Sequence, residues 1–323
     1  MSNAVRMVVV TDDPQSVGGG EARDFADALA SAGGSSAVRV RCEDAGWGAE
    51  LRRIDPQIVL YVPSLLRRSS AFFRSRALRR QTPRARHGMI HLAPFPQPHR
   101  FKFAWRFIRM SAPDVTWVTS YRSLLNLKRL AFPSNVIFPG VDTARFRVTG
   151  DGEKEALRRR WGIGESAFVL ACSHTKVAGF DMGAVLSRID GVTVIVAKRG
   201  AKCPGEAGLA ESGVKTLALD GDPGALYRLA NGFVFAGKSG TAGVETPPDV
   251  WEALASGVPV LARPCGGVAD FLPEGPDLRF WSTAEELEHQ ARFLRTSAPV
   301  KTRPVTEFEW ESIVGGVVES LLS

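Results

Sequence analysis

At 323 residues the chain is long for a single hydrophobic core, so two domains are expected. Its composition, 44% hydrophobic and 23% charged with a formal net charge of +7, is that of a globular protein and excludes a disordered or fibrous chain. No apolar run approaches the roughly 18 residues of a membrane-spanning helix, and no secretory signal pattern opens the sequence, so a cytoplasmic protein is expected.

Short apolar runs alternate with helical stretches through the first half of the chain. The run at residues 7–11 is followed by an acidic loop, by Gly18-Gly19-Gly20, and by a helix with Phe25 and Leu29 at helical spacing. Further strands are predicted at residues 38–40, 58–62, 89–92, 115–118 and 135–138. This alternation is typical of an α/β domain with a parallel sheet.

The same alternation restarts after residue 148. A charged helix is predicted at residues 155–160, and helices begin near Asp181, Pro223 and Pro248. Strands are predicted at residues 168–172, 192–197, 215–219, 232–235 and 258–262, and a final amphipathic helix at residues 308–322. We therefore expect Rossmann-like domains at residues 1–148 and 149–304, with residues 305–323 crossing back to the first domain.

Positive charge is concentrated between residues 51 and 109. This segment holds fourteen Lys and Arg and one acid, Asp55, so its net charge is +13 (14 − 1). An anionic partner is expected, either a phosphate-bearing acceptor, a membrane surface or a nucleic acid, with a merely solvated arginine-rich face as the alternative. Six cations at roughly helical spacing are assigned to this partner: Arg67, Arg68, Arg74, Arg76, Arg79 and Arg80.

The four cysteines are scattered, without Cys-x-x-Cys pairs or a His at ligand spacing. Neither a disulfide framework nor a zinc site is therefore expected. We predict no metal ion and no cofactor.

From Lys215 onward the sequence resembles the retaining GT-B glycosyltransferases of family four. Residues 245–260 resemble the acidic motif of that family, which runs into a Gly-x-Pro-Val strand. Residues 225–231 resemble the helix before a buried strand, Gly266-Gly267-Val268 the loop after the Gly-x-Pro-Val strand, and Trp310 an aromatic of the final helix.

The first half resembles the same family in the same order. Residues 18–21 with the following helix are similar to its N-terminal Gly-Gly loop, and residues 113–120 to its fourth-strand signature. Gly140-Val141-Asp142 with Phe146 resembles the Gly-Val-Asp-x-x-x-Phe of the interdomain crossing. The resemblance implies a GT-B fold: two Rossmann-like domains facing across a cleft, the first binding the acceptor and the second a nucleotide sugar.

The resemblance also implies roles for single residues. It places Glu252 on the donor ribose, and Glu245 and His91 near the transferred sugar as catalytic residues. The family has seven residues between its two acids and this chain has six, so strict alignment puts Val244 at the first position. Glu245 is then either displaced or not equivalent.

The diphosphate ligands of the family, an Arg and a Lys, fall here on Ser173 and Ala178. Lys176 is the expected substitute, and Arg199 follows the next strand. The donor-binding residues expected are Gly19, Gly20, Lys176, Arg199, Gly243, Thr246 and Glu252.

The expected function is metal-independent, retaining transfer of a sugar, a hexose in our interpretation, from a UDP- or GDP-linked donor to a hydroxyl of an anionic or lipid-linked acceptor, in the cytoplasm or peripherally at the membrane. One alternative is transfer to nucleic acid, such as a modified DNA base. Another is a GT-B protein that only binds ligand, because Ser173, Ala178 and the shortened acid spacing depart from the family pattern.

Overall fold

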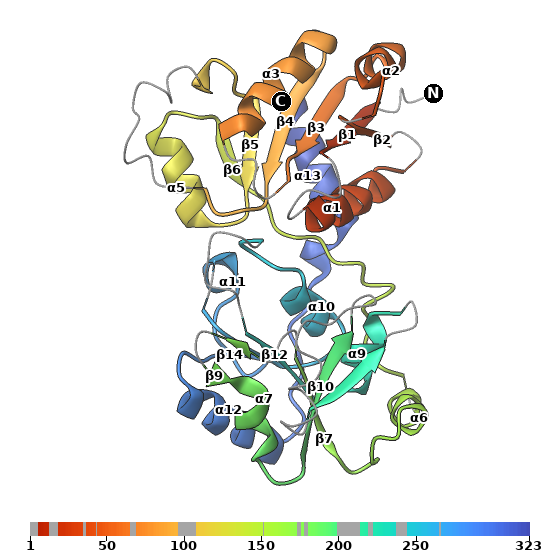
Figure 1. Ribbon diagram of the computed structural model, residues 1–323, viewed down its shortest axis with the longest axis vertical. Coiled ribbons are helices and arrows are strands. Elements are labelled where there is room, and N and C mark those ends of the chain that lie inside the picture. The colour runs from red at the N-terminus through yellow and green to blue at the C-terminus, as the bar shows by residue number, and fades with distance from the viewer. Residues whose placement is uncertain are drawn as a thin grey trace. The chain divides into compact units, whose positions relative to one another are not determined.

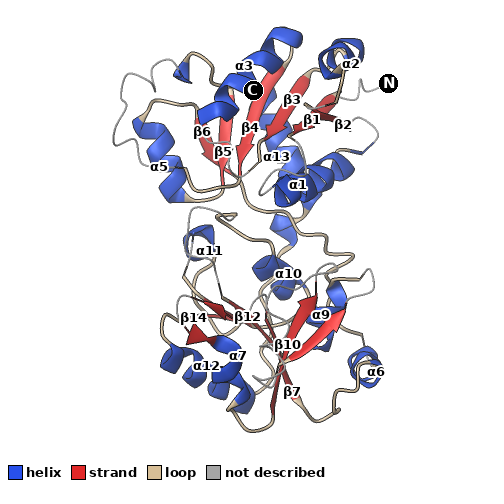
Figure 2. Ribbon diagram, in the orientation of Figure 1, coloured by secondary structure: helices blue, strands red, loops and turns tan. Residues whose placement is uncertain are grey.

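The computed structural model describes residues 6–12, 19–34, 37–42, 44–64, 69–95, 108–150, 152–172, 176–177, 180–198, 214–218, 222–236, 244–264 and 266–323. The chain divides into two compact units (Figure 1). Unit 1 consists of Met1–Gly140, Gly240–Thr246 and Phe308–Ser323, and unit 2 of Val141–Ser239 and Pro247–Glu307. Each unit has its own six-stranded parallel sheet (Figure 2).

The sheet of unit 1, called sheet 1, has the strand order β2-β1-β3-β4-β5-β6. Its strands are β1 (Met7–Thr11), β2 (Ala37–Arg41), β3 (Ile58–Val62), β4 (Arg86–His91), β5 (Val115–Val118) and β6 (Ser134–Val136). β1 and β3 are buried throughout, as their continuous apolar sequences require in a sheet covered on both faces. All strands run the same way, so the sheet has one carboxyl edge and one amino edge.

Helices cover both faces of sheet 1. On one face, α1 (Gly19–Ala32) and α13 (Trp310–Leu322) pack against Val9, Leu60 and Ile90. On the other, α2 (Trp47–Ile54), α3 (Ser69–Gln81) and α5 (Tyr121–Arg129) pack against alternate strand residues such as Val8 and Val59. Successive side chains along a strand point to opposite faces of the sheet and so belong to two separate apolar layers.

Sheet 2, in unit 2, has the order β11-β10-β7-β12-β13-β14. Its strands are β7 (Phe168–Cys172), β10 (Val192–Lys198), β11 (Lys215–Ala218), β12 (Gly232–Phe235), β13 (Val260–Ala262) and β14 (Leu278–Phe280). The helices are α6 (Glu153–Arg160), α7 (Met182–Ser187), α9 (Gly224–Leu229), α10 (Asp249–Ala255), α11 (Gly266–Phe271) and α12 (Ala284–Thr296), with a short antiparallel pair, β8 (Lys176–Val177) and β9 (Phe180–Asp181).

In both sheets the first strand along the chain lies in the interior of the sheet, between the second and third strands in sheet 1 and between the second and fourth in sheet 2. β1 lies between β2 and β3, and β7 between β10 and β12. Strand order reverses at such a point, and α/β sheets bind ligands there, beyond the carboxyl ends of the strands.

Most predicted elements are confirmed, several of them at the predicted residues, including residues 58–62 and 168–172. Asp181, Pro223 and Pro248 are the N-cap residues of α7, α9 and α10. Two predicted loops are wrong, because Gly19 and Gly20 form the first turn of α1, and Gly266–Phe271 form α11. Glycine is well tolerated at a helix N-terminus.

The division into units differs from the expected one in two places. Residues 141–148 belong to unit 2 because Phe146 packs edge-on against Tyr227, with ring centroids 5.8 Å apart. Gly240–Thr246 belong to unit 1, where Val244 packs against the α1/α13 layer. Among the described residues, no helix is long and apolar enough to cross a membrane.

Candidate functional site

His91 is the last residue of β4 and lies at the carboxyl edge of sheet 1. Its side chain is buried, and Nδ1 lies 3.0 Å from the carbonyl oxygen of Ala93. A carbonyl only accepts, so this bond places the proton of the neutral ring on Nδ1 and makes Nε2 an acceptor. The ring meets Phe95 edge-on at 5.7 Å, which fixes its orientation.

Glu245 docks onto the same edge. Its backbone N–H donates to the carbonyl of Leu92 at 2.8 Å, and its carboxylate Oε2 accepts from the Ser123 hydroxyl at 2.7 Å. The side chain is 8% exposed. The structure therefore brings Glu245 next to the residue that follows His91, although the two lie in distant parts of the sequence.

Ser123 connects this segment to α5. Its backbone N–H donates to the Oγ of Ser120, the N-cap residue of α5, and its own Oγ accepts from the N–H of Phe95 at 2.8 Å. Thr246 continues the docking, because its hydroxyl donates to the carbonyl of Thr119. Sequence reasoning missed Ser123; the serine pair three residues apart after β5 is the capping signal by which the start of α5 is recognised.

Asp12, also missed, is buried beyond the carboxyl end of β1. Its carboxylate accepts from the Tyr61 hydroxyl at 2.8 and 3.0 Å and from the N–H of Ser64 at 3.0 Å. These bonds join β1 to β3 at the point where the strand order of sheet 1 reverses. They hold both strand ends in one geometry at the edge that carries His91.

In unit 2, Glu252 lies on α10 and its Oε2 accepts from the Tyr227 hydroxyl at 2.8 Å. Tyr227 is buried and packs against the rings of Phe146 and Phe233, with centroids 5.8 and 5.2 Å away. The carboxylate is therefore held by a hydroxyl whose own position is fixed by aromatic packing. Glu245 and Glu252, seven positions apart, belong to different units.

The remaining predicted donor residues lie partly outside the described residues. Arg199, Gly243, Ser173 and Ala178 fall there, and Lys176 lies in β8 with only its backbone described. Gly19 and Gly20 begin α1.

One acidic pair bears on the prediction of no metal ion. Asp220 and Asp222 have Asp-x-Asp spacing, and Asp220 falls outside the described residues. Asp222 pairs with Arg228 and accepts the N–H of Gly224 at 3.0 Å, so its carboxylate already has protein partners. Within the described ranges, no group of three His, Cys, Asp or Glu is arranged to hold a metal.

The six arginines assigned to an anionic partner, in and just before α3, differ in their exposure. Arg76 and Arg80 are exposed, Arg74 is partly buried, and Arg79 pairs with Asp114 at 2.5 Å; Arg67 and Arg68 fall outside the described residues. Because α3 connects two parallel strands, it runs from the carboxyl edge back to the amino edge. Arg80 therefore lies about 16 Å along the helix from its start, well away from the edge with His91.

The sequence matches no protein-family model. No curated protein matches it significantly either.

Several solved structures are similar over nearly the whole chain. HepE from Anabaena, in complex with UDP and glucose, has a TM-score of 0.70 at 15% identity and covers 98% of this chain and 99% of its own. A glycosyltransferase from Rickettsia africae has a TM-score of 0.68 at 11% identity, covering 98% of both chains. WaaG, a glycosyltransferase involved in lipopolysaccharide biosynthesis, has a TM-score of 0.56 at 14% identity, covering 97% and 95%. With two parallel six-stranded sheets flanked by helices, this chain has the GT-B fold of two Rossmann-like domains.

Proposed function

We propose that this protein is a glycosyltransferase that transfers a hexose from a UDP- or GDP-linked donor to a hydroxyl of an anionic or lipid-linked acceptor. The observation that carries the proposal is the docking of Glu245 beside His91 through Leu92 and Ser123. It joins the acidic motif to the carboxyl edge of sheet 1, the edge at which α/β sheets bind ligands. The GT-B fold, shared with proteins crystallised with UDP, glucose and UDP-glucose, supports the same activity.

For the donor, we propose that the Glu252 carboxylate binds the ribose hydroxyls. Tyr227 holds one oxygen of this carboxylate in place, and a carboxylate accepts several hydrogen bonds, as a ribose diol requires. Lys176, Arg199, Gly243, Gly19 and Gly20 stay predictions as further donor contacts.

For the transferred sugar, the tautomer of His91 decides its role. With the proton on Nδ1, the Nε2 atom accepts a hydrogen bond from a sugar hydroxyl and does not donate one. We propose retaining, metal-independent transfer as in family four, where the departing phosphate helps to deprotonate the acceptor and no protein nucleophile is needed. Cations and backbone N–H groups then stabilise the negative charge of the leaving diphosphate.

For the acceptor, we propose that the cations of α3 attract an anionic group, with the protein in the cytoplasm or peripherally at the membrane surface. Exposed Arg76, together with Phe73, which is 54% exposed, supports this assignment, and Arg80, at the amino edge, stays a prediction. A nucleic-acid acceptor is the second candidate, favoured by the aromatic and cationic residues at 99–109, most of which lie outside the described residues.

The test is a panel of UDP- and GDP-sugars, with nucleotide release as the measure of hydrolysis and a thermal-shift assay as the measure of binding. We expect at least one sugar nucleotide to raise the melting temperature and to be hydrolysed slowly. His91→Gln should lower hydrolysis and leave the thermal shift unchanged. Binding without hydrolysis in the wild type would favour the ligand-binding alternative, and the absence of binding across the panel would refute the proposal.

A further inference from the structure

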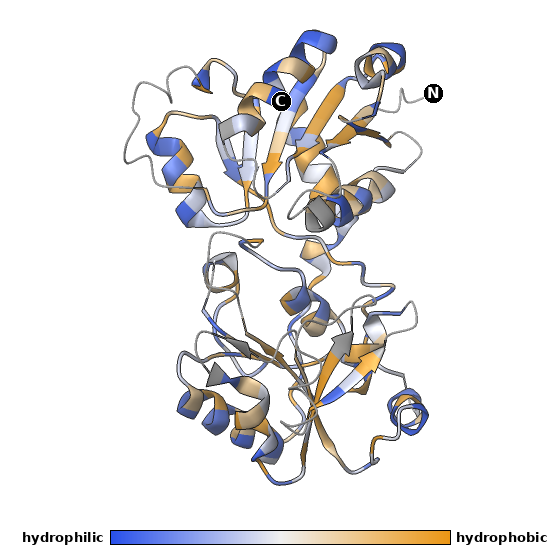
Figure 3. Cartoon of the chain, viewed as in Figure 1, coloured by the Kyte–Doolittle hydropathy of each residue, from blue (hydrophilic) through white to orange (hydrophobic). Residues whose placement is uncertain are grey.

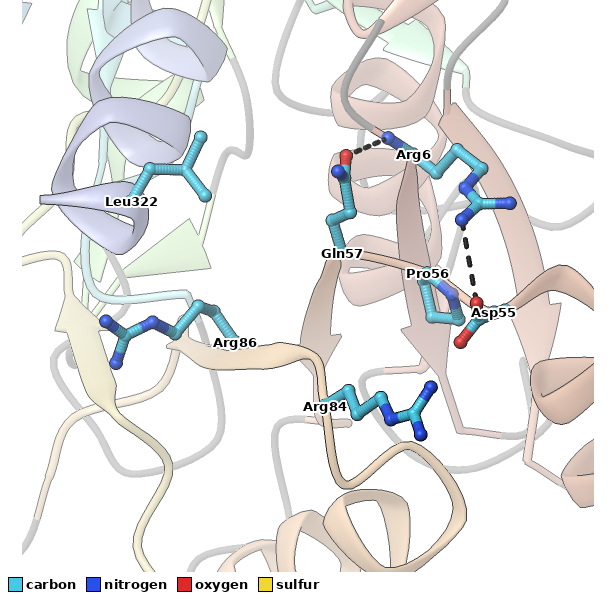
Figure 4. A pocket seen from close by; sticks show the side chains of 7 residues that line it. All are labelled: Arg6, Asp55, Pro56, Gln57, Arg84, Arg86 and Leu322. Carbon is cyan, nitrogen blue, oxygen red and sulfur yellow. Dashed lines mark hydrogen bonds and ion pairs between the residues drawn. The ribbon is translucent and has the colours of Figure 1, made fainter. Parts of the chain in front are cut away.

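The amino ends of three strands of sheet 1 surround a pocket of about 290 Å³ (Figure 4). It is lined by Arg6, Asp55, Pro56, Gln57, Arg84, Arg86 and Leu322. Arg6 precedes β1, Gln57 precedes β3, and Arg86 begins β4. The pocket therefore lies at the amino edge, opposite to the edge that carries His91.

The backbone beneath the pocket is held by strand hydrogen bonds. The N–H groups of Gln57 and Ile58 donate to the carbonyl of Arg6 at 2.9 and 3.2 Å, and the N–H of Arg86 donates to the carbonyl of Gln57 at 2.9 Å. The Gln57 side chain accepts the N–H of Arg6 at 3.1 Å. These bonds fix the backbone of Arg6 and Arg86 on the two sides of β3, whose neighbouring strands lie about 5 Å away.

The residues that line the pocket carry more positive than negative charge. Arg6 lies 3.6 Å from Asp55, an exposed pair that contributes little by itself. Among the described residues no carboxylate forms an ion pair with Arg84 or Arg86, so the lining carries a net charge of +2 (3 − 1). In Figure 4 the Arg86 side chain extends to the side of Leu322 and that of Arg84 to the side of Asp55.

More cations lie in the helix turns that lead to the same edge of the sheet. Exposed Arg52 and Arg53 lie in the last turn of α2, and exposed Arg80 in the last turn of α3. The last turn of α3 is coloured hydrophilic in Figure 3. Such clustering costs free energy through repulsion unless an anion reduces it.

We propose that this pocket binds a phosphate ester, at a site separate from that of the nucleotide sugar. Guanidinium groups bind phosphate oxygens through paired N–H bonds, and Arg84 and Arg86 are the groups available for this. Pro56 and Leu322 provide an apolar wall for the organic part of the ester. The phosphate belongs either to a lipid headgroup or to a soluble metabolite.

The ligand at this site is not the reacting acceptor. Arg86 begins β4 at the pocket and His91 ends it, five residue steps further, a distance of about 16–17 Å. A phosphate held by Arg86 is therefore too far from the carboxyl edge to take part in transfer, and binding here anchors or regulates the protein.

The experiment uses the leucine methyl NMR signals of Leu322, assigned by their loss in Leu322→Val, because they report on this pocket alone. The probes are glycerol 3-phosphate and phosphatidylcholine vesicles containing phosphatidic acid. The pocket variant is Arg84→Gln/Arg86→Gln, and the matched control is Arg122→Gln/Arg129→Gln, two exposed arginines of α5 in the same unit.

We expect glycerol 3-phosphate to shift the Leu322 signals saturably in the wild type and the control, and at least tenfold more weakly in the pocket variant. If only vesicles perturb these signals, again with the pocket variant unresponsive, the source is a lipid headgroup. No response to either probe, or equal weakening in both variants, overturns the proposal. UDP affinity, measured in parallel, should be the same in both variants. If UDP binds to none of the three proteins, the wild type included, the result counts against the donor site and does not affect the conclusion from the Leu322 signals.

Discussion

Among single residues, Glu252 is the one that we propose as the main contact to the donor ribose. Glu252→Ala removes the carboxylate that we assign to the ribose, and a hydrogen bond to a charged group contributes about 1–3 kcal/mol. UDP affinity, measured by calorimetry, should therefore fall about fivefold to 150-fold. Glu155→Ala, an exposed helical acid of the same unit, is the matched control and should leave affinity unchanged. Equal affinities in the two folded variants would exclude the ribose contact.

A buried histidine makes stability depend on pH. Burial lowers the pKa of His87, and the nearby Arg79 lowers it further, against the opposing effects of the Thr82 carbonyl and Asp114. The unfolded chain then binds a proton more readily than the folded protein once the pH falls below about 6.5. Stability should fall as the pH drops from 7.5 to 5.5, by at most about 1.4 kcal/mol per pH unit from this group.

The measurement is urea denaturation at several pH values, compared with His87→Gln, which retains an N–H donor for the Thr82 carbonyl. The wild type should lose more stability than the variant over this pH range. Parallel curves for the two proteins would show that His87 is not the group responsible.

Residues of the site are predictable from the sequence when a local motif or strand pattern marks them, and not when only a distant contact does. Glu252 and His91 stand in local patterns, so their positions follow from the motif or the strand. Ser123, Asp12 and Tyr227 act through partners far away in the sequence, and no local pattern indicates those partners, even though the serine pair Ser120 and Ser123 marks the start of α5. Tertiary packing alone selects such pairs.

Strands and helices are predictable from the sequence where a buried element consists of a continuous run of apolar residues. β1, β3 and β7 are short runs of buried apolar residues, and all three were located at their exact bounds. β14, three residues with a central arginine, has too little periodicity to be recognised. The resemblance predicts a loop where the structure has α11, and two glycines at the start of this short helix give no helical signal that would correct it.

The helix α3 supports the prediction that acceptor and donor are bound separately. Arg76→Glu/Arg80→Glu reverses two exposed charges of unit 1, so association with anionic vesicles or a polyanionic acceptor should fall at least tenfold, while UDP affinity stays within about twofold. Arg79 is left unchanged because its bond to Asp114 is structural. Arg188→Glu/Arg295→Glu, exposed in unit 2, is the control. A parallel loss of UDP binding in the α3 variant would contradict the separation.

At the scale of the whole chain, Gly140 ends the first segment of unit 1 beneath the Trp310 ring of α13. A Cβ atom at Gly140 would lie 2.2 Å from that ring, so the glycine is required for close approach. Gly140→Ala should destabilise the protein by about 1–3 kcal/mol through overpacking. Denaturation would show this, with Gly315→Ala, where no atom lies within 4 Å, as the control. Adding Trp310→Leu should recover part of the loss; a neutral Gly140→Ala would contradict the packing argument.

The path of the chain between the units limits how the protein can be divided. The chain passes from one unit to the other after Gly140, Ser239, Thr246 and Glu307. A fragment ending at Gly140 would lack Val244 and the α13 residues Ile313, Val314 and Val317, which complete one apolar layer of sheet 1. We therefore expect that neither half folds as a simple continuous fragment of the chain. Arg6 and Leu322, however, line one pocket, so a circularly permuted chain with these ends joined by a short linker should keep unit 1 intact.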